Sequence, residues 1–312
     1  MVTDRDDVTS SRAIGTSLAA VGTPGRPVSD PVAPDALAAR LLAVVAGYGR
    51  SLVAFSGGVD SSVVLAAAVR ALGPGGVAAV TAVSPALPAA ELAAARALAA
   101  ELGVTHHTPA TRELDVDGYR GNGPRRCYFC KSVLLDTAGT LARQHGFATV
   151  LTGTNASDVA AGFRPGIRAA SERGARTPLA DLGLAKDSVR AIARLWQLRT
   201  WDKPAAPCLA SRIAYGVPVS ADRLARIERA EAAVRDRLRA GGHAATDLRV
   251  RDLGDTVRLE LDADAVEPAR GDPGVVAAIS GSGFGARPVE IQSFRTGSMN
   301  ELLPDPQHWR TA

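Results

Sequence analysis

The chain has 312 residues, of which 46% are hydrophobic and 22% charged, which is typical of a globular protein with room for two domains. Its formal net charge of +4 is too small to indicate a nucleic-acid partner by itself. We expect neither a membrane span nor a secretory signal, because no apolar run is long enough and the N-terminus (MVTDRDDVTSSRA) is acidic and polar. A cytoplasmic location follows, in which the three cysteines are expected to be thiols rather than disulfides.

Residues 1–34 are rich in Ser, Thr, Asp, Gly and Pro, which predicts a disordered N-terminal extension. Over residues 35–203, apolar segments of strand and helix character alternate along the chain. This alternation predicts an α/β domain with a doubly wound, mostly parallel sheet. The expected helices span 36–48, 61–72, 87–102, 131–145 and 186–196, and the expected strands lie at 52–55, at 76–84, within 105–114 and at 148–154.

Residues 204–312 are expected to form a smaller α+β domain, because the character of the sequence changes after Trp201, where a Pro-rich connector (DKPAAPC) begins. The expected elements are, in order, a charged amphipathic helix at 221–240, a hairpin with Gly254 and Asp255 at its turn, a short helix near 273–280 and a strand at 288–294.

The segment SGGVDSS, between an expected strand and an expected helix, has the composition of a phosphate-binding turn. Two glycines permit a tight turn, and backbone amides and serine hydroxyls at the start of a helix can surround a phosphate. Asp60 suits such a site if Mg²⁺ neutralises the phosphates. A glycine-rich turn that is merely capped by serines is the alternative. The candidate residues are Ser56, Gly57, Gly58, Asp60, Ser61 and Ser62.

No lysine follows these glycines, so the segment is not the phosphate loop of the GxxxxGK[ST] type. It resembles the SGGxDS signature of the PP-loop group, whose members cleave ATP between the α and β phosphates and adenylate a substrate. A second polar segment, LTGTNASD at 151–158, ends an expected strand, where α/β sheets bind ligands. The resemblance places Gly153, Thr154 and Asn155 in the wall of the nucleotide site, and Asp158 at polar or metal contacts.

Cys127 and Cys130 (RRCYFCK) are three residues apart and could bind one metal or cluster, whereas Cys208 lies far along the chain. A structural zinc site would need a fourth ligand, and a thioredoxin-like pair would need a different context. Three buried apolar side chains are the remaining alternative. Three cysteines without a fourth suit a [4Fe–4S] cluster with one open iron. We expect three neighbouring cations to lower the thiol pKa values if they lie close: Arg125, Arg126 and Lys131.

Over residues 40–300 the chain carries, in order, SGGVDSS, RCYFCK, GTNASD, FRPGIRAA, TPLADLGLAKDSVR, DKPAAPCLASRIAYG, LRVRDLGDTVRLEL and FRTGSMNEL. Together these segments resemble the LarE family of ATP-dependent sulfur-insertion proteins. The resemblance implies that ATP adenylates the carboxylate of pyridinium-3,5-biscarboxylic acid mononucleotide, and that sulfur then replaces AMP to give the thiocarboxylate used in synthesis of the nickel-pincer nucleotide, the lactate racemase cofactor. It also implies a homo-oligomer, which is a hexamer in that family.

The same resemblance implies one of two sulfur sources. A thiolate at Cys208 would attack the adenylate and give up its own sulfur, or Cys127, Cys130 and Cys208 would together hold a [4Fe–4S] cluster that carries a transferable sulfide. The three-cysteine pattern of this chain favours the cluster.

Arg249 and Arg251 are two residues apart on the expected hairpin, so both side chains face one side of a strand. Paired guanidiniums suit a phosphate monoester, although a solvated, salt-bridged strand face is the alternative. The resemblance implies that this pair binds the phosphate of the substrate. It further assigns catalytic roles beside Cys208 to Arg212 and Glu231, and substrate contacts to Ser211, Glu260 and Arg295.

Three other functions compete with this hypothesis. A PP-loop tRNA thiolase would also use a CxxC pair, but would need a broad basic surface or an RNA-binding module. An ammonia-dependent amide synthetase would need neither Cys208 nor the CxxC pair. A nucleotide-binding or cluster-carrying protein without turnover would release no pyrophosphate.

Overall fold

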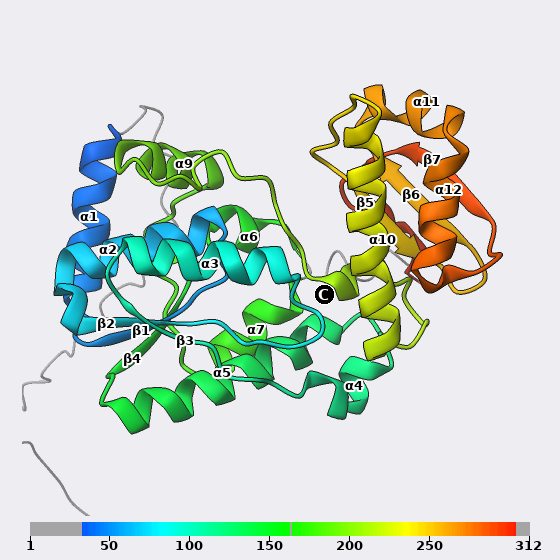
Figure 1. Ribbon diagram of the computed structural model, residues 1–312. Coiled ribbons are helices and arrows are strands. Elements are labelled where there is room, and N and C mark those ends of the chain that lie inside the picture. The colour runs from blue at the N-terminus through cyan, green and yellow to red at the C-terminus, as the bar shows by residue number, and fades with distance from the viewer. Residues whose placement is uncertain (1–32, 163, 304–312) are drawn as a thin grey trace, which may run out of the picture. The chain divides into compact units, whose positions relative to one another are not determined.

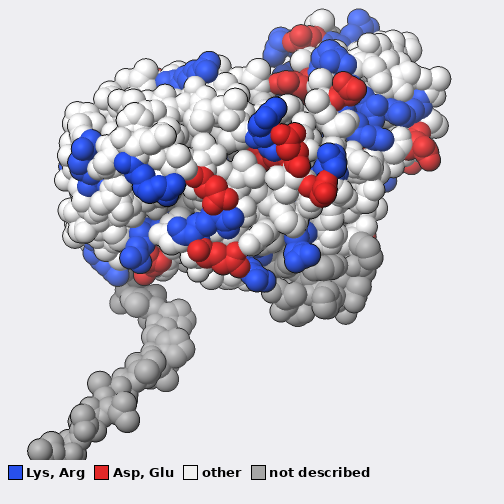
Figure 2. All heavy atoms as spheres, turned by 90° about the horizontal axis from the view of Figure 1, so that it is seen from below, with Lys and Arg blue, Asp and Glu red and all other residues white. Residues whose placement is uncertain are grey.

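The computed structural model describes residues 33–162 and 164–303, which form an α/β structure with two separate sheets (Figure 1). The disordered extension predicted for residues 1–34 lies almost wholly outside the described residues. No helix within the described ranges combines the length and apolar character that a bilayer crossing needs. On the face shown in Figure 2, basic and acidic side chains are interspersed.

The first sheet has four parallel strands in the order β3-β2-β1-β4, which confirms the predicted parallel α/β sheet. The chain builds this sheet outward from β1 to β3 and then returns to place β4 on the other side of β1. The point between β1 and β4 is therefore a topological switch point, where open α/β sheets bind ligands. The strands are β1 (Ser51–Ala54), β2 (Val77–Val80), β3 (Thr105–His107) and β4 (Thr149–Thr152).

Different helices cover the two faces of this sheet, as a doubly wound fold requires (Figure 1). Val53 and Leu151 belong to an apolar cluster with α1 (Pro34–Ala46), α2 (Val59–Leu72), α3 (Ala89–Glu101) and α9 (Lys186–Leu195). Leu52 and Val80 belong to a cluster on the opposite face with α5 (Arg126–His145). Successive strand residues point to opposite faces, and this alternation assigns each side chain to its cluster.

Helix α5 begins at Arg126, five residues earlier than the predicted start at 131, so Cys127 and Cys130 both lie at its N-terminal end. The helix ends at Gly146, whose φ of +67° permits the left-handed cap conformation. Four short helices near the site were not predicted from the sequence: α4 (Asp117–Arg120), α6 (Ala156–Ala160), α7 (Pro165–Glu172) and α8 (Pro178–Asp181). Single helical turns lie at η1 (Pro74–Gly76) and η2 (Glu113–Asp115).

The second sheet has three strands in the order β5-β6-β7, and it confirms the predicted smaller α+β region. The predicted hairpin is present, because β5 and β6 pair antiparallel and Gly254 at their turn has a φ of +94°. Strand β7 pairs parallel to β6, since an unpredicted helix, α11, lengthens the connection between them. The elements are η3 (Leu209–Arg212), α10 (Ala221–Ala240), β5 (Arg249–Asp252), β6 (Val257–Leu261), α11 (Ala263–Gly271), α12 (Pro273–Ile279), η4 (Ser280–Phe284), β7 (Val289–Ser293) and η5 (Ser298–Leu302).

The apolar cluster around the second sheet includes side chains from before the connector. Ala86 and Tyr119, which are 5% and 1% exposed, pack with residues of η3, α10 and the three-stranded sheet. We retain 35–203 and 204–312 as the proposed division of the chain, with these two side chains packing across it.

Candidate functional site

The SGGVDSS segment, which we call the nucleotide loop, forms a tight turn after β1 at 56–58 and continues into the first turn of α2, which begins at Val59. Gly57 has a φ of +72°, and a Cβ at this position would lie 3.2 Å from the Cβ of Ala95, so only glycine fits without strain. The hydroxyls of Ser56 and Ser61 are 3.2 Å apart, and the Ser62 hydroxyl donates to the Gly58 carbonyl oxygen at 2.8 Å. The loop thus places amides and hydroxyls at a helix N-terminus, where the helix dipole favours an anion.

The loop after β4 packs directly against this first loop, at the switch point of the sheet. A Cβ on Gly153 would lie 2.6 Å from the backbone nitrogen of Ser61, so glycine permits the close approach. The Asn155 side chain accepts a hydrogen bond from the backbone N–H of Asp158 at 2.9 Å and caps α6. Its amide nitrogen donates to Asp60 Oδ1 at 3.0 Å. This hydrogen bond joins two segments that lie 95 residues apart in the sequence.

Asp60 carries its negative charge between two partners. Besides Asn155, it forms an ion pair with Lys186 at the start of α9, through its second oxygen, Oδ2. The sequence predicts that Asp60 approaches a Mg²⁺ ion bound to the phosphates. In the structure a lysine ammonium supplies the positive charge at that carboxylate.

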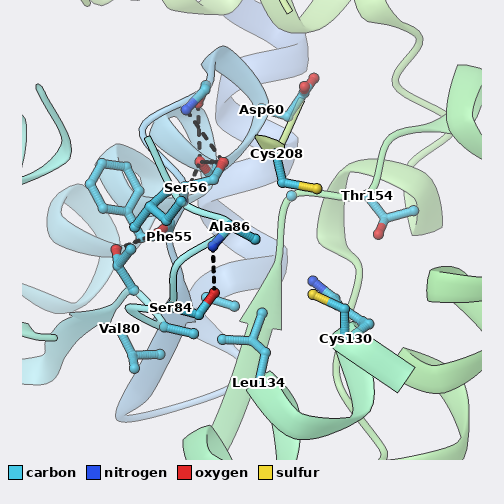
Figure 3. Close-up of a pocket in the computed structure, with 18 of the residues that line it drawn as sticks. Phe55, Ser56, Asp60, Val80, Ser84, Ala86, Cys130, Leu134, Thr154 and Cys208 are labelled. Carbon is cyan, nitrogen blue, oxygen red and sulfur yellow. Dashed lines mark hydrogen bonds between the residues drawn. The ribbon is translucent and has the colours of Figure 1, made fainter. Parts of the chain in front are cut away.

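A cavity of about 400 Å³ is lined by residues of the nucleotide loop and by two of the three cysteines. Figure 3 shows Cys130 and Cys208 with their sulfur atoms directed into the space between the loop and Thr154. Cys127 is exposed and lies outside the lining of this cavity. Among the predicted nucleotide-site residues, the cavity is lined by Ser56, Gly58, Asp60, Ser61, Gly153, Thr154 and Asp158.

Desolvation dominates the electrostatics of the CxxC pair. It raises the pKa of Cys130, and the nearby Cys208 and Glu113 raise it further, while Lys131 acts in the opposite direction. The pKa of Cys127 is also raised, mainly by the protein atoms around its thiol although part of the residue stays exposed, and Arg126 opposes the shift. The two cations therefore act as predicted, but the predicted net lowering of these thiol pKa values is wrong, because loss of water outweighs it.

The three thiols are the right kind of ligand for an iron–sulfur cluster, but their positions in the structure do not form a binding site for one. Cys208 contributes to the raised pKa of Cys127, and both Cys208 and Cys127 contribute to the raised pKa of Cys130, so the three thiols lie within electrostatic reach of one another. A cation among such desolvated thiols would favour their thiolate forms. However, within the described residues no group of three or more His, Cys, Asp or Glu side chains is arranged to hold a metal ion. The donor types fit an iron–sulfur cluster, whereas this arrangement of them does not.

The connector that carries Cys208 is attached to the nucleotide loop. Lys203 Nζ donates to the Gly57 carbonyl oxygen at 3.1 Å and to Glu91 at 2.7 Å. Arg190 of α9 donates to the carbonyl oxygens of Trp201 and Lys203, at 3.0 and 3.2 Å. The connector is thus held by its side chains and by its backbone.

Arg212 organises the backbone around Cys208. Its guanidinium donates to the carbonyl oxygens of Pro207 and Cys208, and it forms a buried ion pair with Glu231, with Nε to Oε1 at 2.9 Å. Glu231 also accepts a hydrogen bond from the Val250 amide at 3.1 Å. These contacts place both predicted residues beside the Cys208 segment, in a supporting rather than an exposed position.

The two predicted phosphate ligands differ in how fully they are engaged. Arg251 is paired with the buried carboxylate of Glu260, at 2.7 and 3.0 Å, and it donates to the Ser211 carbonyl oxygen at 3.3 Å. Arg249 lies 3.6 Å from Asp247, and its Nε has no hydrogen-bond partner among the described residues. The terminal nitrogens of Arg249 donate to the carbonyl oxygens of Leu248 and Ala205, at 2.8 and 3.1 Å, so Arg249 differs from Arg251 in having no close carboxylate partner in the described part of the chain. Arg295 is at the surface, paired with Glu301 at 2.9 Å.

Sequence reasoning missed three residues at the site: Glu113, Lys186 and Lys203. A signal for the lysines was present, because an arginine-rich chain contains only Lys131, Lys186 and Lys203. Lys131 lines the cavity. Lys186 contacts the nucleotide loop at Asp60, and Lys203 contacts it at Gly57. Glu113 lines the same cavity and had no sequence signal.

A parallel sheet with a Ser–Gly loop at its switch point defines an α/β protein of the PP-loop class. The profile of the asparagine synthase family matches residues 49–253. The chain is 40% identical over 257 residues to an uncharacterized protein of Synechocystis sp., covering 81% of this chain and 93% of that relative. It is 34% identical over 274 residues to the pyridinium-3,5-bisthiocarboxylic acid mononucleotide synthase of Lactiplantibacillus plantarum, covering 86% and 95%. The chain belongs to the LarE family of the PP-loop superfamily.

Proposed function

We propose that this protein is an ATP-dependent, AMP- and pyrophosphate-forming sulfur transferase of nickel-pincer nucleotide synthesis. Its substrate would be pyridinium-3,5-biscarboxylic acid mononucleotide and its product the corresponding thiocarboxylate. The observation that carries the proposal is that Cys208 and the SGGVDSS loop line the same cavity. The similarity to a pyridinium-3,5-bisthiocarboxylic acid mononucleotide synthase over most of both chains supports the choice of substrate.

The chemistry requires that a carboxylate first becomes an electrophile. Its oxygen attacks the α-phosphorus of ATP and expels pyrophosphate, and the resulting acyl adenylate has AMP as a good leaving group. Sulfur then bonds to the carbonyl carbon, the bond between this carbon and the AMP oxygen breaks, and AMP leaves with the electron pair. When the nucleophile is the Cys208 thiol, its proton is released as a thioester forms. Loss of the Cys208 Cα proton then breaks the Cβ–S bond, which leaves dehydroalanine in the chain and the sulfur on the substrate as the thiocarboxylate.

Each part of the site would have a defined task in this reaction. The Ser56–Ser62 loop would bind the phosphates of ATP, and Asp60 would approach their Mg²⁺ once Lys186 leaves it. Arg249, which has no close carboxylate partner among the described residues, would exchange its contacts with backbone carbonyl oxygens for the substrate phosphate. Arg251 would act through Glu260 and Ser211, and Arg295 is the outermost of the proposed substrate ligands.

The proposal also covers the group that donates the sulfur. Cys127, Cys130 and Cys208 supply the donor types of a [4Fe–4S] cluster, and they would hold one, with an open iron for a transferable sulfide, only after moving closer together than they stand in the structure. Cys208 as the sacrificial donor is the alternative. In either case Arg212 and Glu231 fix the backbone at Cys208, so that its sulfur stays directed into the cavity.

The test is an anaerobic single-turnover assay with ATP, Mg²⁺ and the pyridinium mononucleotide. We expect pyrophosphate, AMP and a product whose mass shows one oxygen replaced by sulfur, and we expect Cys208→Ala to release pyrophosphate without forming that product. Pyrophosphate release that depends on tRNA or on ammonia, instead of on the mononucleotide, would contradict the proposal.

Iron and sulfide analysis separates the two sulfur sources. Cluster chemistry predicts bound iron and sulfide that are lost in Cys127→Ala, together with repeated turnover when sulfide is supplied. Sacrificial chemistry predicts no iron and one product per chain. It also predicts a loss of 34 Da from the spent protein, the mass of H₂S, as Cys208 becomes dehydroalanine. We further propose a cytoplasmic homo-oligomer, by analogy with the family.

A further inference from the structure

Glu113 is a buried carboxylate in the wall of the cavity to which neither the motifs nor the reaction gives a role. It begins the single turn η2, is 4% exposed, and lines the cavity together with Cys130 and Cys208. Its position is therefore at the sulfur side of the cavity rather than on the surface.

The two oxygens of this carboxylate are used differently. Oε1 accepts a hydrogen bond from the Thr111 hydroxyl at 3.0 Å. Oε2 is buried and accepts no hydrogen bond from any described residue. A desolvated carboxylate oxygen without a donor or a cation is unfavourable, so this oxygen lacks a partner in the described part of the structure.

The charge of Glu113 reaches the groups that surround the cavity. It contributes to the raised pKa of Cys130 and to the raised pKa of Tyr119. An anionic ligand group placed at this position would be repelled, whereas a cationic group would be attracted.

We propose that Glu113 is the binding site for the cationic ring of the substrate, with Oε2 facing a pyridinium. This inference rests on the proposed function and deepens it, because it states how the positive part of the substrate is recognised. Glu113 and Arg249 then complement the opposite charges of one ligand, with the ring at the carboxylate and the phosphate at the guanidinium. Cys208 lines the same cavity as Glu113.

The test compares two ligands of nearly equal shape and different ring charge. Nicotinamide mononucleotide contains a cationic pyridinium, and its reduced dihydro form contains a neutral ring. Binding of each is measured by calorimetry in the presence of Mg²⁺ and saturating α,β-methylene-ATP, which fills the nucleotide site without being cleaved between its α and β phosphates. We expect the wild type to bind the cationic form at least about tenfold more tightly than the neutral one.

In Glu113→Gln, which keeps the shape and removes the charge, this preference should fall to within about twofold. Glu267→Gln, which removes a surface charge paired with Arg270, is the matched control and should keep the wild-type preference. Unchanged binding of α,β-methylene-ATP shows that Glu113→Gln is folded. Equal binding of the two forms by the wild type, or a preference that persists in Glu113→Gln, would overturn the proposal.

The binding measurement requires no turnover, so it is independent of the proposed reaction. A wild type that shows the charge preference but releases no pyrophosphate with the dicarboxylate would overturn the proposed function alone. Turnover without any charge preference would overturn only the role of Glu113.

Discussion

At the scale of single residues, the nucleotide site requires glycine at position 153, because any side chain there would collide with the backbone of α2. Gly153 lies against the start of α2, and a Cβ there would be 2.6 Å from Ser61 N and 2.9 Å from the carbonyl carbon of Asp60. Both neighbours are backbone atoms, which cannot rotate away as a side chain could.

We expect Gly153→Ala to destabilise the protein by roughly 1–3 kcal/mol and to weaken ATP binding about tenfold or more, because the two loops must separate. Thermal unfolding and calorimetry with ATP measure the two effects. Gly75→Ala is the control, since a Cβ at Gly75 meets no atom within 4 Å. Equal behaviour of the two variants would show that the close contact has no importance.

The thiols give a second prediction at this scale. The raised pKa of Cys130 means that the folded protein keeps this proton to higher pH than the unfolded chain, whose thiols ionise near pH 8.5. Alkylation of Cys130 in the cluster-free protein should therefore keep accelerating above about pH 8.5, where the rate for a free thiol levels off, and Glu113→Gln should accelerate it further. Peptide mass mapping measures the rate. A rate that levels off near pH 8.5 would disagree.

The sign of the effect on stability follows from the same shift. Above about pH 8.5 the unfolded chain has lost the proton that folded Cys130 still binds, so folding stability falls as pH rises through this range. Cys127, whose pKa is also raised, acts in the same direction.

At the scale of elements, the connector from Trp201 to Cys208 joins the two halves of the proposed reaction. Its attachment to the nucleotide loop runs through Lys203, whose ammonium contacts the Gly57 carbonyl and Glu91. We therefore expect ATP binding in the nucleotide loop to affect the position of Cys208 through Lys203. Lys203 itself contacts neither the α-phosphorus nor the sulfur in the proposed reaction.

We expect Lys203→Met to retain adenylation but to lose sulfur transfer, so that AMP and pyrophosphate still form while thiocarboxylate falls about tenfold or more. The ratio of thiocarboxylate to pyrophosphate measures this separation. Arg199→Ala, which removes a surface pair with Glu101, is the control in the same segment. A parallel fall of both products would show that Lys203 serves ATP binding alone.

The elements were predicted well where periodicity is strong and poorly where tertiary packing decides. Helix α10 has the predicted bounds, since its charged and apolar residues alternate over its whole length. Helix α5 starts earlier than predicted, because RRCYFC reads as a polar turn until its packing against α4 and α7 is known. Helix α11 contains Pro268, which obscured it in the sequence.

At the scale of the whole chain, the two sheets share side chains rather than standing apart. Tyr119 and Ala86, from the part that carries the first sheet, complete the apolar cluster of the second. The Leu209 amide donates to the Ala86 carbonyl oxygen at 2.8 Å, and Glu228 of α10 accepts from the Ala89 amide at 2.7 Å.

We expect residues 33–303 to unfold in one cooperative transition, because removing either region exposes the apolar surface of the other. Scanning calorimetry should give a calorimetric enthalpy equal to the van't Hoff enthalpy, and α,β-methylene-ATP should shift the whole transition. Two resolved peaks, of which only one responds to the nucleotide, would show that the regions are independent.

The parts of the candidate site that are formed by contiguous sequence motifs could be predicted, and the contacts between residues far apart in the sequence could not. The SGGVDSS loop and the residues after β4 are contiguous motifs, and their contact follows from the strand order. The partners of Asp60 and Gly57 are 126 and 146 residues away, so only the fold reveals them. Whether cations lower the thiol pKa depends on burial, which the sequence does not state.

The ion pair between Lys186 and Asp60 has a consequence for the order in which ligands enter. A divalent cation arriving alone must displace the ammonium from this carboxylate and gains no phosphate ligands in return, so free Mg²⁺ competes poorly. ATP offers that ammonium its phosphates, and the carboxylate becomes free for the metal at the same moment. Metal and nucleotide should thus each raise the other's affinity, which makes the resting protein indifferent to cellular magnesium until ATP is present.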